Sequence, residues 1–196
     1  YSLVYSPEGA LIVGDLFGRI RVLDSHLKTL RELEQKEFHL LDRIQDVGGV
    51  RCLAFSPDGK TLYAAGCQPK TGGFVQAFPL LVALDFATGK TLWSWKGAND
   101  NEGIVHDLRV FADGRLAAVT SGQPGQGKFL LFEPPTATPA FVSTKMPNCH
   151  SVDIHPDGKQ IATSATNANS SGNGRVKGKA GEYPENSSPI QYWDIE

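Results

Sequence analysis

One short sequence pattern occurs four times in the chain. In its clearest copy, residues 53–63 read Leu-Ala-Phe-Ser-Pro-Asp-Gly-Lys-Thr-Leu-Tyr, so apolar side chains alternate, a turn follows, and apolar residues resume. Pro57 presets the φ angle of the turn, the Asp58 carboxylate can bond the nearby backbone, and Gly59 tolerates a positive φ. The pattern therefore predicts two antiparallel strands joined by a tight turn.

The spacing of the four copies predicts the architecture. The glycines that end the four turns are 50, 55 and 44 residues apart, at Gly9, Gly59, Gly114 and Gly158. A repeat of about fifty residues that contains several short strands is typical of a β-propeller blade. We therefore expect an all-β fold: a β-propeller segment of about four blades of four-stranded antiparallel sheets. As one domain, residues 1–196 would divide into blades at approximately 1–48, 49–102, 103–147 and 148–196.

Residues 26–45 fit two kinds of secondary structure. Lys28-Thr29-Leu30 repeats the phrase Lys90-Thr91-Leu92 of the second unit, which favours an outer strand. The spacing of the apolar residues over the same span also fits one face of a helix. The sequence favours the strand and leaves the helix open.

The end of the chain predicts an incomplete blade. Residues 167–189 are rich in Ser, Asn and Gly and have few apolar side chains to pack, and residues 190–194 supply only a third strand. An uncovered blade face costs on the order of ten kcal/mol, which rivals the stability of a whole domain. We therefore expect these blades to belong to a larger ring.

Charge and cysteine content argue against several function classes. Nineteen basic and twenty-one acidic residues give a net charge of -2, which offers no field for nucleic acid, and no apolar run approaches the ~18 residues of a membrane span. Cys52, Cys67 and Cys149 lack the C-x-x-C spacing of zinc sites, so we expect no metal. Buried free thiols, or one disulfide with a free thiol, both remain open, and so does the compartment.

The repeated motifs resemble those of the WD-repeat class of β-propellers. They comprise the Ser-Pro-Asp-Gly turn, the Gly-Lys-Thr-Leu link, and the dipeptide Trp193-Asp194, whose place is taken elsewhere by Leu23-Asp24, Leu84-Asp85 and Phe132-Glu133. The usual Gly-His pair is missing, which places the chain in a divergent branch. The resemblance implies a scaffold that binds proteins. Residues 81–93 are also similar to the repeat of pyrroloquinoline-quinone dehydrogenase propellers, once only.

In such a propeller the inserted segments share one face. They are residues 35–49, 68–78, 122–127 and 167–189. Loops carry function when a rigid scaffold positions them, so this face is the candidate binding surface. Within the last insertion, Arg175, Lys177 and Lys179 could wrap an acidic or phosphorylated group, and Tyr183 could anchor the segment; a solvated loop is the alternative.

Four residues are expected near the mouth of the central channel. They lie eight positions before each turn glycine and are Tyr1, Arg51, His106 and His150. The two histidines could hold an anion or a metal, although such residues commonly bond the backbone of the adjacent blade instead.

The leading interpretation is a non-enzymatic propeller scaffold, without a cofactor, that mediates protein-protein or interdomain interaction through the face carrying the inserted loops. The alternative is an enzymatic or electron-transfer, quinoprotein-like propeller with a cofactor or ligand at the channel mouth. Binding of a small ligand or glycan on the same face is a third possibility.

Overall fold

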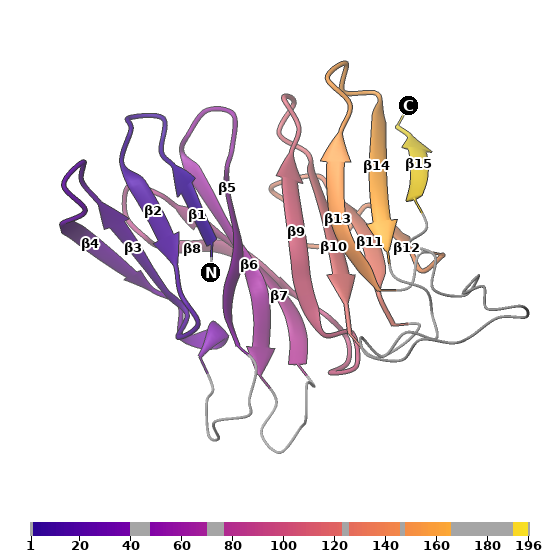
Figure 1. Cartoon of the computed structure of the whole chain (residues 1–196), viewed down its shortest axis with the longest axis horizontal. Helices are drawn as coiled ribbons and strands as arrows, with labels where there is room; N and C mark the ends of the chain where they lie inside the picture. Colours follow the sequence, from indigo (N-terminus) through magenta and orange to yellow (C-terminus); the bar gives the residue numbers. More distant parts are fainter. Residues whose placement is uncertain are drawn as a thin grey trace, which may run out of the picture.

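The computed structural model describes residues 2–39, 48–69, 77–122, 126–145, 148–165 and 190–195. These residues form four separate antiparallel sheets that stand side by side along the molecule (Figure 1). In every sheet the strands are paired in the order in which they occur in the sequence. The predicted all-β class and the repeated blade-like sheets are confirmed.

The first sheet resolves the ambiguity at residues 26–45 for the part that is described. It contains β1 (Ser2–Tyr5), β2 (Leu11–Gly14), β3 (Arg19–Leu23) and β4 (Thr29–Glu34). A short 3-10 helix, η1 (Lys36–Phe38), follows β4 and buries Phe38. The favoured outer strand is thus confirmed, with one helical turn behind it, and residues 40–45 lie outside the described part.

The remaining sheets follow the same plan. The second contains β5 (Gly49–Phe55), β6 (Thr61–Pro69), β7 (Ala77–Asp85) and β8 (Thr91–Lys96). The third contains β9 (Ile104–Val110), β10 (Leu116–Ser121), β11 (Lys128–Phe132) and β12 (Phe141–Ser143). The fourth contains β13 (Cys149–Ile154), β14 (Gln160–Ala165) and β15 (Ile190–Asp194). Within the described ranges this sheet has three strands, as expected from the sequence.

The four predicted turns join the first and second strands of each sheet. Gly9, Gly59, Gly114 and Gly158 all have φ between 70° and 92°, a region that side chains disfavour. In the second turn the Asp58 carboxylate accepts hydrogen bonds from the Ser56 hydroxyl at 2.6 Å and the Lys60 backbone N–H at 3.1 Å. The turn therefore has the chemistry that its sequence predicts.

Apolar side chains are buried between successive sheets. One cluster joins the first two sheets through Ile12, Ile20, Leu62, Leu80 and Leu84. A second joins the second and third sheets, and a third, which includes Phe129 and Trp193, joins the third and fourth. The first strands β1, β5, β9 and β13 contact one another in succession, so they line the inner side of the array.

Among the described residues, no other sheet covers the outer face of the first sheet. Leu3 and Tyr5 on β1 are 68% and 66% exposed. The matching residues of β5 in the second sheet, Leu53 and Phe55, pack instead into the cluster between the first two sheets. The first sheet thus exposes apolar residues at two positions. In the second sheet, the equivalent positions make the contact with the neighbouring sheet.

Candidate functional site

The strands that flank the predicted insertions end at one edge of the molecule, which we call the insertion edge. It is formed by the end of β6 and the start of β7, and by the corresponding ends of β10 and β11 and of β14 and β15. The four turns that contain Gly9, Gly59, Gly114 and Gly158 lie at the opposite edge, which we call the turn edge (Figure 1). Arg175, Lys177, Lys179 and Tyr183 lie outside the described residues.

Three of the predicted channel-mouth residues lie on neighbouring inner strands. Arg51 is on β5, His106 on β9 and His150 on β13, each near the start of its strand and hence toward the insertion edge. The imidazole rings of His106 and His150 lie 4.8 Å apart between centroids and meet edge to face at 70°. The two histidines, which the sequence placed only near the channel mouth, thus contact each other across a blade boundary. Tyr1 lies outside the described part.

The surroundings of the two histidines favour their neutral forms. Burial, followed by the neighbouring His150 and Arg51, lowers the pKa of His106 to about 4, while Asp107 opposes the shift. Burial also lowers the pKa of His150. Both side chains also remain partly exposed to solvent. At neutral pH this pair is uncharged beside one guanidinium.

The alternative expectation was that these histidines bond the backbone of the adjacent blade. Among the described residues, the two rings contact each other and neither makes such a bond. The tie is made by the next residue in each first strand. The Ser2 hydroxyl donates to the Val50 carbonyl at 3.3 Å, and the Cys52 thiol donates to the Val105 carbonyl at 3.7 Å. This position lies seven residues before the turn glycine, and it holds a hydrogen-bonding side chain in all four units.

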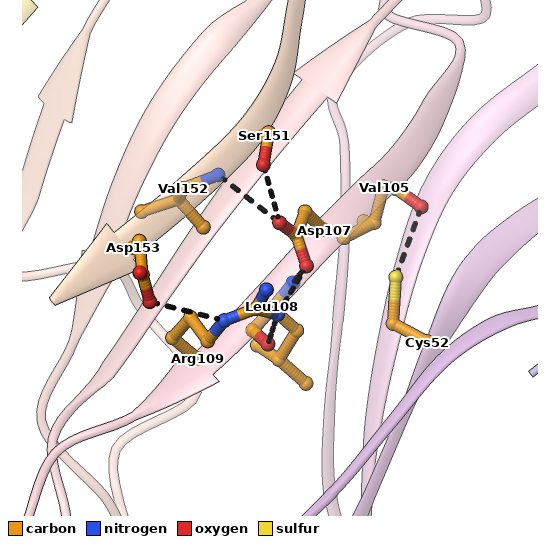
Figure 2. A network of polar contacts seen from close by, with 8 residues as sticks. All are labelled: Cys52, Val105, Asp107, Leu108, Arg109, Ser151, Val152 and Asp153. Carbon is orange, nitrogen blue, oxygen red and sulfur yellow. Dashed lines mark hydrogen bonds and ion pairs between the residues drawn. The ribbon is translucent and has the colours of Figure 1, made fainter. Parts of the chain in front are cut away.

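Asp107 makes the most extensive of these ties (Figure 2). Its Oδ2 accepts hydrogen bonds from the Ser151 hydroxyl at 3.0 Å and the Val152 backbone N–H at 3.1 Å, both on β13. Its Oδ1 accepts from the Leu108 N–H at 2.9 Å and pairs with the Arg109 guanidinium, which also reaches Asp153 at 3.5 Å. Asp107 was not predicted from the sequence, although a side chain able to hydrogen-bond follows the channel-mouth position in all four units.

The cysteines are free and buried, which settles the choice between thiols and a disulfide. Burial raises the pKa of each thiol, in Cys52, Cys67 and Cys149, to about 12. A thiol must ionise to act as a nucleophile or a metal ligand, so these side chains are protonated and unreactive at neutral pH. Within the described ranges, no group of three or more His, Cys, Asp or Glu side chains is arranged to hold a metal ion.

Comparisons with known proteins agree with this architecture. Residues 43–69 match the family described as WD domain, G-beta repeat. Hydrazine synthase of Kuenenia stuttgartiensis has a similar structure, with a TM-score of 0.62 and 20% identity over 84% of this chain and 43% of that one. A chain in a crystal structure of the mitotic checkpoint complex gives a TM-score of 0.61 and 19% identity over 84% and 44%. A comparison with curated proteins finds no match.

These comparisons confirm the resemblance to WD-repeat β-propellers in one sequence repeat and in the fold. The chain spans less than half of the length of either solved chain. Among the described residues, none of the helical structure is long and apolar enough to cross a membrane.

Proposed function

We propose that the chain is a non-enzymatic propeller segment that binds another protein, or another domain of its own chain, through the insertion edge. The observation that carries this proposal is the gathering at one edge of the insertion-flanking strand ends together with Arg51, His106 and His150. Propellers of the WD-repeat class commonly serve as protein-interaction scaffolds, which supports a protein as the partner.

A rigid base beneath the insertions supports the proposal. The Ala77 N–H donates to the Asp100 carbonyl at 3.0 Å, and the Gly103 N–H donates to the Ala77 carbonyl at 3.1 Å, which ties the second sheet to the third. The Lys128 ammonium pairs with the buried Glu102 carboxylate at 2.8 Å, and the Asn99 amide donates to the same oxygen at 3.0 Å. A fixed base lets neighbouring loops act as one binding surface.

The charges at this edge favour an acidic segment as the partner. Arg51 lies near His106 at the inner side, and the neutral imidazoles of His106 and His150 can donate hydrogen bonds to an acidic group. We propose that Arg175, Lys177 and Lys179 add to this positive charge and that Tyr183 anchors the last insertion. A carboxylate or phosphate group on the partner would complement the inner side around Arg51 and the basic residues of the last insertion.

The test replaces the three basic loop residues in the full-length protein. Chemical cross-linking would identify the partner, and its affinity would then be measured with purified components. The variant Arg175→Ala/Lys177→Ala/Lys179→Ala should weaken binding at least tenfold and reduce its salt dependence. A matched control removes basic residues from the turn edge, as Lys60→Ala/Lys159→Ala. If the control weakens binding as much as the loop variant, the insertion edge is not the binding surface.

The contact between His106 and His150 favours one second candidate, a cofactor or ligand at the channel mouth. The fold does not decide between the two, because one similar structure is by its name an enzyme. Metal analysis and an ultraviolet-visible spectrum of the full-length protein separate them. A stoichiometric metal, quinone or haem that is lost in His106→Ala would favour the enzymatic or electron-transfer candidate.

The exposed outer face of the first sheet supports a larger ring. We propose that blades outside residues 1–196 cover Leu3 and Tyr5, as the first sheet covers Leu53 and Phe55. The change Leu3→Asp/Tyr5→Asp should then lower the thermal stability of the full-length protein. Unchanged stability would show that this face is open to solvent in the intact molecule.

A further inference from the structure

A groove opens at the turn edge between the second and third sheets, away from the insertion edge. Its volume is about 550 Å³, within the range of ligand sites. The turn between β5 and β6 lines one side, with Pro57 and Asp58, and the turn between β9 and β10 lines the other, with Asp113. Glu133 and Pro134, just after β11, complete it.

Between the first two sheets, a proline side chain packs against the turn at the equivalent place. There the Pro7 ring packs against Gly59 so closely that an added Cβ would lie 2.5 Å from the Pro7 Cγ. At Gly114, the equivalent position one blade later, an added Cβ would meet nothing within 4 Å. Pro57 therefore leaves open the space that Pro7 closes.

Tyr63 is a buried polar side chain that lines this groove. It is only 3% exposed and its ring lies 6.0 Å from the Trp93 ring, inside the cluster between the second and third sheets. Its hydroxyl makes no hydrogen bond with any residue that the structure describes. The equivalent positions of the other three units hold Ile12, Ala117 and Ala162, so only this blade places a hydroxyl there.

The Tyr63 ring is buried while the residue lines the open groove, so a ligand in the groove can reach a hydroxyl that has no partner among the described residues. Burial and the nearby Asp58 carboxylate raise the pKa of Tyr63, which keeps the phenol protonated. The phenol oxygen is then an available acceptor at the base of an open groove.

The charges around the groove are mainly negative. Asp58, Asp113 and Glu133 line it with a single guanidinium, that of Arg115. The Arg115 Nε pairs with the Asp113 carboxylate at 2.8 Å, and the guanidinium lies 4.9 Å from the centre of the Phe111 ring, so both charges of that pair are satisfied.

The other two carboxylates keep oxygen atoms for a ligand, since Asp58 uses only its Oδ1 for the Ser56 hydroxyl and the Lys60 N–H. The ammonium of Lys60 is 4.0 Å from Asp58, but its side chain is 83% exposed and can turn into solvent. Glu133 forms no ion pair within the described part of the chain. A positively charged group entering the groove would therefore find two carboxylates and one phenol oxygen.

We propose that this groove binds an arginine or lysine side chain of an extended segment of a partner protein. The charged head group pairs with Asp58 and Glu133 and donates a hydrogen bond to the Tyr63 hydroxyl. Pro57 and Pro134 offer apolar surface to the aliphatic part of the side chain. The site is distinct from the insertion edge, so it does not depend on the function proposed above.

The test uses the full-length protein and a fluorescein-labelled pentapeptide of four glycines around one central arginine, followed by fluorescence anisotropy. We expect saturable binding, and at least tenfold weaker binding of the peptide in which neutral citrulline replaces arginine. Tyr63→Phe keeps the ring and should weaken binding about tenfold, because it removes a hydrogen bond to a charged group. Glu133→Gln should weaken binding about threefold.

Glu8→Gln is the matched control, because it removes the same charge from the turn of the first blade, where Pro7 closes the space. It should leave the affinity unchanged, and thermal unfolding curves would show that each variant is folded. Equal binding of the citrulline peptide, or equal losses in Glu8→Gln and Glu133→Gln, would overturn the proposal. So would ethylguanidinium competing as tightly as the peptide, since the occupant would then be a small cation rather than a protein segment.

Discussion

The junction between the first and second sheets and the junction between the third and fourth are held together by different chemistry. The first junction has mainly aliphatic side chains at its centre, around the buried Phe38; they include Ile12, Ile20, Leu62, Leu80 and Leu84. At the third junction aromatic rings contact one another across the sheets: the rings of Phe129 and Trp193 lie 4.9 Å apart, and Phe141 lies 5.9 Å from Trp193. The repeat therefore fixes where sheets meet without fixing which apolar side chains fill the contact.

The polar ties at the two junctions differ more strongly. At the first junction Ser2 makes one hydrogen bond of 3.3 Å to a carbonyl. At the third junction the equivalent Asp107 accepts two hydrogen bonds from β13 and holds Arg109 in place. A hydrogen bond to an ionised group is about twice as strong as a neutral one. We therefore expect the first junction to depend on packing and the third to depend also on charge.

The largest expected effect is the loss of aliphatic packing in Leu62→Ala. Leu62 is fully buried in the first junction, and truncation there leaves a cavity that costs about 3 kcal/mol of unfolding free energy. Urea unfolding of the full-length protein would measure the loss, which should be the same at pH 5 and pH 7.5. Leu92→Ala, at an exposed position, is the control and should change little. A loss that grows at low pH would contradict a junction held by packing.

The next largest effect is expected for Asp107→Ala at the third junction. The change leaves the buried Val152 N–H without its acceptor and removes the partner of Arg109, at a cost of about 2 kcal/mol. Hydrogen exchange should accelerate at Val152 and on β14 but not on β2. The control is Asp153→Ala, which removes an exposed partner of Arg109. Equal effects of the two changes would show that Asp107 acts only through Arg109.

The architecture could be predicted because its signals are local. The turn glycines require a positive φ, and apolar alternation around them gives strand pairs, so the four hairpins follow from short stretches of sequence. The outer strand β4 was also predicted, because Thr29 and Leu30 repeat a phrase of the second unit. The 3-10 turn of η1 was not predicted as such, since its helical pattern competed with the strand pattern over the same residues.

The site was predictable only in part, because it depends on contacts between units. Counting from the turn glycine placed His106 and His150 at equivalent positions of adjacent blades, and in the structure their rings meet at the inner strands. The same count, one residue later, leads to Asp107. The sequence does not show, however, that its carboxylate accepts hydrogen bonds from the next sheet. Tyr63 was missed for the same reason: the sequence does not show that its hydroxyl lacks a partner among the described residues.

A smaller effect is expected from acidification of the histidine pair, and it should be confined to the third junction. The folded-state pKa of His106 lies near 4, below its ordinary 6.5, so its contribution is complete above pH 6.5 and is lost as the pH falls toward 4. Because the ring is partly solvated, we expect a loss of about 1 kcal/mol rather than the full shift. Hydrogen exchange at Val152, corrected for intrinsic rates, would follow it. His106→Gln should flatten the pH dependence, and His26→Gln, on a loop, should not.

The smallest expected effect is that of Ser2→Ala at the first junction. The change removes one neutral hydrogen bond of 3.3 Å to the Val50 carbonyl and should cost about 0.5 kcal/mol, because such a bond largely replaces one to water. The Val50 N–H keeps its own bond to the Asp15 carbonyl at 2.9 Å, so the strand retains a tie to the first sheet. Urea unfolding of Ser2→Ala and Asp107→Ala under the same conditions compares the two losses of unfolding free energy, and hence the two junctions. If Ser2→Ala costs as much as Asp107→Ala, charge does not distinguish the junctions, and the backbone contacts that both share must account for their stability.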